Sequence, residues 1–278
     1  MRGRLPGPPL LMIQVATQIF RFRALLWTLT ARELTARYRG SALGYLWSLA
    51  NPLLLLGVYT FVFSVVFRPR VAGADPYALF VVSGLFPWVW LSTSLLEGTV
   101  SLTANSGLLR KAVFPVELLP SVAVLSNLFH LLFATPVLAG AILVGRYFGH
   151  PVGGWATLLA PLVVLLEVPL IAGLALGLSA LNVHFKDVRD LLTNLLALAF
   201  FLTPILYRIE ALDGLPRVQA AIRANPFAPF ALAYQRTIFE GRVPEPSLWL
   251  HMALVSALAW IAGAWLFDRL RETLVEAA

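Results

Sequence analysis

Six long runs of apolar residues constrain this chain more than any other feature of its sequence. They cover residues 42–67, 77–97, 118–145, 155–182, 190–207 and 248–267. The first and third runs carry no charged residue, and Glu167 is the one charge inside the fourth. A helix needs about 20 mostly apolar residues to cross a bilayer, at about 1.5 Å of rise per residue. We therefore expect an all-α integral membrane protein with six transmembrane helices.

Composition supports a lipid environment and excludes several kinds of site. The chain is 59% hydrophobic and 13% charged, whereas soluble domains carry about 25% charged residues. Cysteine is absent, which excludes disulfides, thiolate catalysis and cysteine-ligated metals, and the four histidines lack metal-ligand spacing. The basic residues that give the chain its net charge of +7 lie mostly between the apolar runs. Their placement indicates membrane topology and not a nucleic-acid partner. We expect no metal site and no bound nucleic acid.

The distribution of basic residues predicts the orientation of the chain. With six spans, both termini and the second and fourth loops share one side. Arginine and lysine gather on that side at positions 2, 4, 21, 23, 32, 37, 39, 110, 111, 186, 189, 269 and 271. The short loops on the other side carry only Arg68, Arg70 and Arg146. Because cytoplasmic loops are enriched in these residues, we expect a multi-pass membrane protein with both termini in the cytoplasm.

Two further segments are amphipathic without being long enough or apolar enough to span. Within residues 10–36, apolar side chains recur every three or four positions, which is typical of a helix lying flat on the cytoplasmic membrane surface. Residues 208–247, between the fifth and sixth spans, are too apolar for a simple external loop. We expect short re-entrant helices there, lying at or dipping into the outer interface.

The sequence offers no site for ATP hydrolysis or other enzyme chemistry. Its only lysines, Lys111 and Lys186, do not belong to a G-x-x-x-x-G-K-[ST] phosphate-binding loop. No Ser/His/Asp order or paired-carboxylate site stands out. These absences argue against a membrane enzyme, and we expect no cofactor in this chain. If ATP and Mg²⁺ drive it, a separate subunit must bind them.

Three blocks of sequence carry a family resemblance. The first is Arg37-Tyr-Arg-Gly-Ser-Ala-Leu-Gly-Tyr-Leu-Trp47, followed by Asn51-Pro52 and Val58-Tyr-Thr-Phe-Val-Phe63. The second is Asn105-Ser-Gly-Leu-Leu-Arg-Lys111, followed by Phe114-Pro115 and Glu117-Leu-Leu-Pro120. The third is Leu181-Asn-Val183, Lys186-Asp-Val-Arg189, Phe201-Leu-Thr-Pro-Ile-Leu-Tyr207 and Asn225-Pro226. Together they resemble the ABC-2 type permeases of bacterial polysaccharide exporters, which move O-antigen, capsule or teichoic acid chains.

The resemblance implies an architecture and a set of partners. It implies a single ABC-2 transmembrane domain over residues 1–278, of the type V exporter class, that forms a homodimer on two copies of a cytoplasmic ATPase subunit. Residues 101–117 would form a coupling helix on the ATPase, and residues 208–247 would form external gate helices. A lipid-linked glycan would enter from the cytoplasmic leaflet between the first and fifth spans.

Candidate ATPase contacts follow from this placement. The loop 101–117 offers apolar anchors and charges, namely Leu108, Leu109, Arg110, Lys111, Phe114 and Glu117. The alternative is that its two cations only enforce topology. A second contact is expected at Lys186, Asp187 and Arg189, unless this charged group pairs internally.

Candidate substrate contacts lie before and along the first span. Arg32, Arg37 and Arg39 precede it at the level of the headgroups, where arginine could bind the pyrophosphate of a lipid-linked glycan. The alternative is plain anchoring to anionic lipid. Tyr59 and the phenylalanines at 63 and 67 recur every fourth residue and share a helix face. Such a row could line a sugar channel or belong to an interfacial aromatic belt.

Glu167 is the most unusual residue of the spans, since an ionised side chain at mid-membrane costs about 2.5–3.5 kcal/mol. We expect it to be buried and either protonated, paired inside the bundle or in contact with water. A structural clamp to His130 or Asn127 of the third span would also explain it. Gly173 and Gly177 form a small-xxx-small pair, which suits close packing of two helices.

Two rival functions remain open at this point. One is an ABC-2 permease that exports a drug or a small lipid, and the other is a membrane glycosyltransferase. The sequence alone does not choose among O-antigen, capsule and teichoic acid as the polymer.

Overall fold

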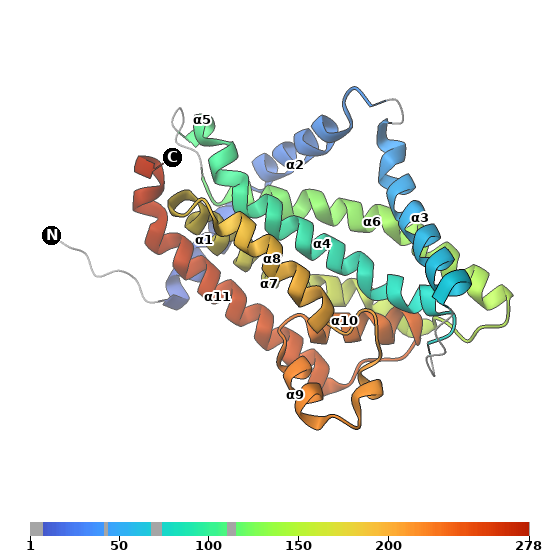
Figure 1. The fold of residues 1–278 in the computed structure, drawn as a ribbon. Coiled ribbons are helices and arrows are strands. Elements are labelled where there is room, and N and C mark those ends of the chain that lie inside the picture. The colour runs from blue at the N-terminus through green and yellow to red at the C-terminus, as the bar shows by residue number, and fades with distance from the viewer. Residues whose placement is uncertain (1–7, 42–43, 68–73, 110–114, 278) are drawn as a thin grey trace.

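The computed structural model describes residues 8–41, 44–67, 74–109 and 115–277, which form helices and turns without a β-strand among them (Figure 1). The α-helices are α1 Pro8–Arg21, α2 Arg23–Tyr38, α3 Trp47–Thr60, α4 Tyr77–Ala104, α5 Ser106–Leu109, α6 Leu118–Tyr147, α7 Ala160–His184, α8 Val188–Leu202, α9 Pro216–Ala224, α10 Ala228–Tyr234 and α11 Pro246–Ala277. Short 3₁₀ turns lie at Gly44–Leu46, Trp155–Leu159 and Ile209–Leu212, and π-helical turns at Phe61–Phe67 and Gln235–Phe239.

Four of the predicted spans form helices that are long and apolar enough to cross a membrane. Within the described residues these are α4, α6, α7 with its preceding 3₁₀ turn, and α11 as far as Arg271. The protein is therefore a multi-pass membrane protein. The runs 42–67 and 190–207 form shorter helices, α3 and α8. The π-helical turn follows α3 directly. Helix α8 ends at Leu202, and the next residue, Thr203, has an extended backbone because a residue that precedes a proline, here Pro204, disfavours the helical conformation.

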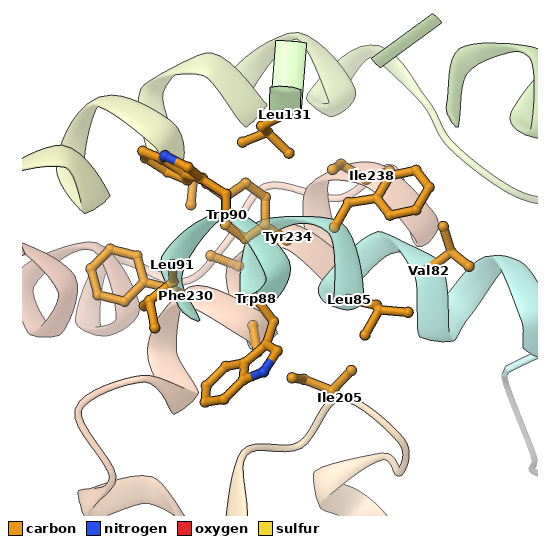
Figure 2. Packing of buried hydrophobic residues seen from close by; sticks show 14 of the residues in the cluster. Val82, Leu85, Trp88, Trp90, Leu91, Leu131, Ile205, Phe230, Tyr234 and Ile238 are labelled. Carbon is orange, nitrogen blue, oxygen red and sulfur yellow. The ribbon is translucent and has the colours of Figure 1, made fainter. Parts of the chain in front are cut away.

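Helix α4 forms the centre of the bundle. It packs against α6, α7 and α8 and buries most of its length. Figure 2 shows its Trp88 and Trp90 among side chains contributed by α6, the turn after α8 and helix α10. The Trp90 indole donates a hydrogen bond to the carbonyl of Val124 at 3.3 Å. Since lipid offers little hydrophobic drive between helices, this close packing holds the spans together.

The tightest helix crossing joins α7 and α11, and it confirms the expected packing role of Gly173 and Gly177. A Cβ added at Gly173 would lie 2.5 Å from the carbonyl oxygen of Ala259. A Cβ added at Gly263 of α11 would lie 1.8 Å from the carbonyl oxygen of Gly173. The two backbones are thus in direct contact, an approach that only glycine permits.

Residues 10–36 were expected to form one helix at the cytoplasmic interface, and the expectation of a single helix is wrong. The chain breaks at Phe22, which leaves the helical conformation (φ −97°, ψ 23°) between α1 and α2. Val15 of α1 packs in a cluster with Phe267 of α11, whereas Leu26 of α2 packs with Leu118 and Val122 of α6. The break lets α1 and α2 pack against different helices.

The segment 208–247 contains the short helices expected there. Helix α9 lies at one end of the bundle, whereas α5 and the end of α11 lie at the other (Figure 1). Helix α10 packs against α4, α7 and α11, and its residues are nearly all buried. The part of the segment from α10 to Phe239 therefore folds back into the bundle, whereas α9 is largely exposed.

Candidate functional site

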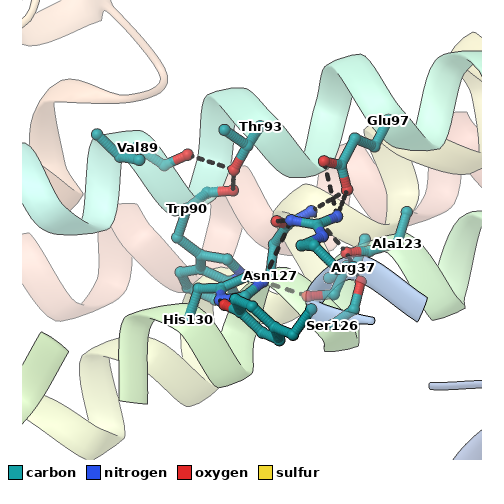
Figure 3. Close-up of polar contacts among 11 residues, drawn as sticks. Arg37, Val89, Trp90, Thr93, Glu97, Ala123, Ser126, Asn127 and His130 are labelled. Atoms are coloured by element: carbon teal, nitrogen blue, oxygen red, sulfur yellow. Dashed lines mark hydrogen bonds and ion pairs between the residues drawn. The ribbon is translucent and has the colours of Figure 1, made fainter. Parts of the chain in front are cut away.

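A polar cluster centred on Arg37 joins three helices (Figure 3). Arg37 lies at the end of α2, and its Nη2 donates to both carboxylate oxygens of Glu97 in α4, at 2.9 and 2.8 Å. Its Nη1 lies 3.3 Å from Oδ1 of Asn127 and 3.2 Å from Nε2 of His130, both in α6. Both terminal nitrogens of the guanidinium are thus held by α4 and α6.

The partners of Arg37 also contact one another. The Asn127 amide donates to Oε2 of Glu97 at 2.6 Å and to the carbonyl of Ala123 at 3.0 Å. The Tyr38 hydroxyl lies 3.0 Å from Nδ1 of His130. Because a guanidinium can only donate, Nε2 of His130 must accept from it and Nδ1 carries the proton. The cluster is a closed network in which each polar group orients the next.

The ion pair remains accessible to water. The side chains of Arg37 and Glu97 are 30% and 39% exposed. A pair of this exposure contributes only about 0–1 kcal/mol to folding stability, because solvent screens the charges. The ion pair therefore adds little to the folding stability of the protein by itself.

The cluster closes one end of a cavity of about 740 Å³ between α3, α4 and α6. Near Arg37 the lining is polar and includes Ser41, Ser48, Asn51, Thr93 and Asn127. Farther along the same helices it becomes apolar, with Leu55, Val58, Phe86, Leu131 and Ala134. A cavity with a cationic end and apolar walls suits an amphiphile that has an anionic head, and its volume is that of a ligand site.

Of the three arginines expected to meet substrate phosphate, the structure brings only Arg37 to this cavity. Arg32 and Arg39 are exposed and do not line it. Sequence reasoning missed Glu97, although an acidic residue at the end of an apolar run was a usable signal. It also assigned Asn127 to a different partner.

The aromatic row along the end of α3 and the π-helical turn after it is confirmed as one helix face. The rings of Tyr59 and Phe63 are 5.7 Å apart, and those of Phe63 and Phe67 are 6.3 Å apart. The row continues into α4, where Tyr77 lies 4.9 Å from Phe63. Phe80 then follows at 5.9 Å from Tyr77. Whether this row lines a channel or faces lipid stays a prediction.

Glu167 is buried, as expected, but the clamp to His130 or Asn127 is wrong. Its side chain is 2% exposed, and its Oε2 accepts a hydrogen bond of 2.7 Å from the Tyr234 hydroxyl of α10. The expected partners are instead engaged by Arg37, and His130 is only half-buried. Glu167 therefore ties α7 to α10 of the segment 208–247.

Replacing Tyr234 with phenylalanine should lower the free energy of unfolding by about 1–3 kcal/mol, because it leaves a buried carboxyl group without its partner. Thermal unfolding of the purified protein in detergent would measure the change. The double variant Y234F/E167L should recover much of the loss, since both polar groups are then gone. Tyr207→Phe is the matched control, because the Tyr207 hydroxyl donates a 3.2 Å bond at an exposed position. Equal effects of Y234F and Y207F would contradict this account.

The predicted coupling loop is described only in part. Leu108 and Leu109 lie in α5, while Arg110, Lys111 and Phe114 lie outside the described residues. The expectation that Glu117 touches a docked ATPase needs correction. Its side chain is 1% exposed, and Oε2 lies 3.8 Å from Nη2 of Arg271 in α11. Glu117 is the N-cap residue of α6, and its buried carboxylate faces Arg271 of α11.

The second predicted contact is the turn between α7 and α8. Lys186, Asp187 and Arg189 are all exposed there. Among the described residues, no ion pair joins Lys186, Asp187, Arg189 and Asp190, so the alternative of an internally paired cluster is not supported. Contact of this group with an ATPase stays a prediction.

Comparison with known proteins identifies relatives over almost the whole chain. The model of the "ABC-2 type transporter" family matches residues 24–239. The "O-antigen export system permease protein RfbA" of Myxococcus xanthus is 35% identical over 266 residues, which is 95% of this chain and 99% of that protein. A protein of the same description from Klebsiella pneumoniae is 31% identical over 91% of this chain and 94% of its own. The "Polysialic acid transport protein KpsM" of Escherichia coli is 21% identical over 88% of this chain and 92% of its own length.

Proposed function

This chain belongs to the ABC-2 type transporter family, and we propose from this premise that it is the transmembrane subunit of an ATP-driven polysaccharide exporter. The observation that carries the function is the similarity to O-antigen export permeases along nearly the full length of both chains. The chain is a transport subunit and not an enzyme. The Arg37 cavity adds a place where an anionic lipid head could bind.

The proposed substrate is a lipid-linked polysaccharide of the O-antigen type, moved outward from the cytoplasm. Deleting the gene tests this directly. Lipid-linked polymer should accumulate inside the cell, and the polymer at the cell surface should disappear. Capsule or teichoic acid as cargo would show in the chemistry of the accumulated polymer. Unchanged surface polymer would reject the proposal and favour export of a drug or small lipid.

The proposed topology keeps six spans, both termini in the cytoplasm and the bacterial inner membrane as the location. Helix α3 with its π-helical turn would serve as the first span and α8 as the fifth. Support comes from α5 and the end of α11 lying together, opposite α9 (Figure 1), since the basic loops then share one side. The working unit would be a homodimer bound to two ATPase subunits, which bind ATP and Mg²⁺.

We place the entrance for the substrate at the Arg37 cavity, between the first, second and third spans. The family resemblance had implied an entrance between the first and fifth spans. The cavity is the better candidate because Arg37 offers donors to phosphate oxygens at its polar end, while its apolar walls suit a lipid chain. The glycan would then pass the aromatic row, and α9 and α10 would form the outer gate.

The ATPase would act through the loop 101–117 and the exposed turn at Lys186–Arg189. The double variant R110A/K111A should reduce export by about tenfold while the complex still hydrolyses ATP, because loss of charged contacts weakens docking. Export per ATP hydrolysed in proteoliposomes measures the effect. The matched control is R217A/R242A, which removes two exposed arginines from the external segment. Unchanged coupling in R110A/K111A would reject the docking role.

A further inference from the structure

The contacts of Arg37 are divided between residues that line the cavity and one carboxylate that does not: Nη1 contacts Asn127 and His130, and Nη2 contacts Glu97. Arg37 lines the cavity, but Glu97 does not. Both hydrogen bonds from Nη2 go to the Glu97 carboxylate. Apart from Arg37 and His130, the described residues that line the cavity carry no titratable acid or base except the Tyr38 phenol. An anion in the cavity would therefore meet one cation, and that cation already holds a carboxylate.

A carboxylate and a phosphate compete for the same guanidinium donors. Both bind arginine through oxygen atoms in one plane with its nitrogens. The Glu97 carboxylate is also held by the Asn127 amide at 2.6 Å, so it is positioned before any ligand arrives. Since both charged side chains are about one-third exposed, water can solvate the carboxylate after it is displaced. Exchange is thus physically possible without leaving a buried charge.

We propose that Glu97 is an internal competitor that sets how strongly a lipid anion must bind before it can occupy Arg37. The inference rests on the proposed function, because it concerns the same entrance. The lipid that overcomes the competitor is one whose head carries a pyrophosphate, with several anionic oxygens. Bulk phospholipids with a single negative charge bind too weakly to displace Glu97 from Arg37, so the abundant lipid of the membrane does not block the entrance.

The variant Glu97→Gln removes the competing charge and keeps the shape of the side chain. The full chain would be purified into phosphatidylcholine nanodiscs, and the Kd of a polyprenyl pyrophosphate would be measured with and without phosphatidylglycerol. In the wild type, phosphatidylglycerol should change this Kd little. In E97Q the Kd without phosphatidylglycerol should fall by roughly tenfold, the effect of one nearby charge in a partly solvated site. In E97Q, phosphatidylglycerol should compete with the polyprenyl pyrophosphate for Arg37 and raise its Kd again.

The matched control is Glu245→Gln, because Glu245 forms an ion pair of the same length, 2.8 Å to Arg236, in the external segment. The E245Q variant should leave the Kd unchanged both with and without phosphatidylglycerol. An E97Q Kd that is unchanged or weaker in both lipid mixtures would overturn the proposal, since Glu97 would then only hold Arg37 in place. The E97Q effect should vanish in the R37Q background, and its persistence there would also overturn it. If R37Q itself leaves pyrophosphate binding intact, the entrance placed at Arg37 fails instead.

Discussion

Replacing Arg37 with glutamine is expected to reduce export of the lipid-linked polymer by about 10- to 100-fold. A charge-assisted hydrogen bond is worth about 1.5–3 kcal/mol, which corresponds to that range in affinity. The loss should appear as weaker substrate binding, measured as the substrate concentration needed for half-maximal ATP-driven export. Folding should suffer little, because the Arg37–Glu97 pair is partly exposed and contributes little to stability.

The neighbouring arginines supply the controls for this result. Arg32 and Arg39 lie close to Arg37 in sequence but do not line the cavity. If Arg37 acts through the cavity, R32Q and R39Q should each change export less than twofold. If the three arginines only anchor the chain to anionic lipid, all three variants should behave alike. Arg37→Lys should be intermediate, since lysine keeps the charge but loses the planar set of donors.

Replacing Gly263 with valine is expected to lower the free energy of unfolding by about 3 kcal/mol or more. Overpacking a well-packed interior costs about 1–3 kcal/mol where side chains can adjust. Here the obstructing atoms belong to the backbone of Gly173, at 1.8 Å from the added Cβ, so α7 and α11 must separate. Thermal unfolding in detergent and the yield of folded protein would measure the loss.

Gly140→Val is the matched control for the glycine variant. Gly140 lies inside the long span α6, and an added Cβ there meets no atom within 4 Å. It carries the same gain in volume and the same change in helix propensity as G263V. A midpoint of unfolding that falls equally in the two variants would contradict the close crossing of α7 and α11.

The features that could be predicted from the sequence are those set by local pattern. Apolar runs of sufficient length predicted α4, α6, α7 and α11 as spans, and the spacing of Gly173 and Gly177 predicted a close helix contact. The aromatic row on α3 followed from its four-residue period. In each case the periodicity of one helix determines the result, so no knowledge of a partner helix was required.

The features that were missed depend on which helices become neighbours. Arg37 meets Glu97, and Glu167 meets Tyr234, across separations of 60 and 67 residues. Nothing local in the sequence distinguishes these pairs from Glu167 with His130, which was the expected alternative. The break at Phe22 has the same origin, because α1 and α2 turn toward α11 and α6 respectively. Tertiary packing decided all three.

The central claim is that this chain provides the membrane path and takes its energy from an ATP-hydrolysing partner. The most direct measurement compares movement of a lipid-linked polysaccharide across proteoliposomes that contain the chain alone, or the chain with its partner ATPase and ATP. We expect transfer only in the second case, and its loss when ATP is replaced by a non-hydrolysable analogue. Sustained outward transfer by the chain alone would contradict the claim.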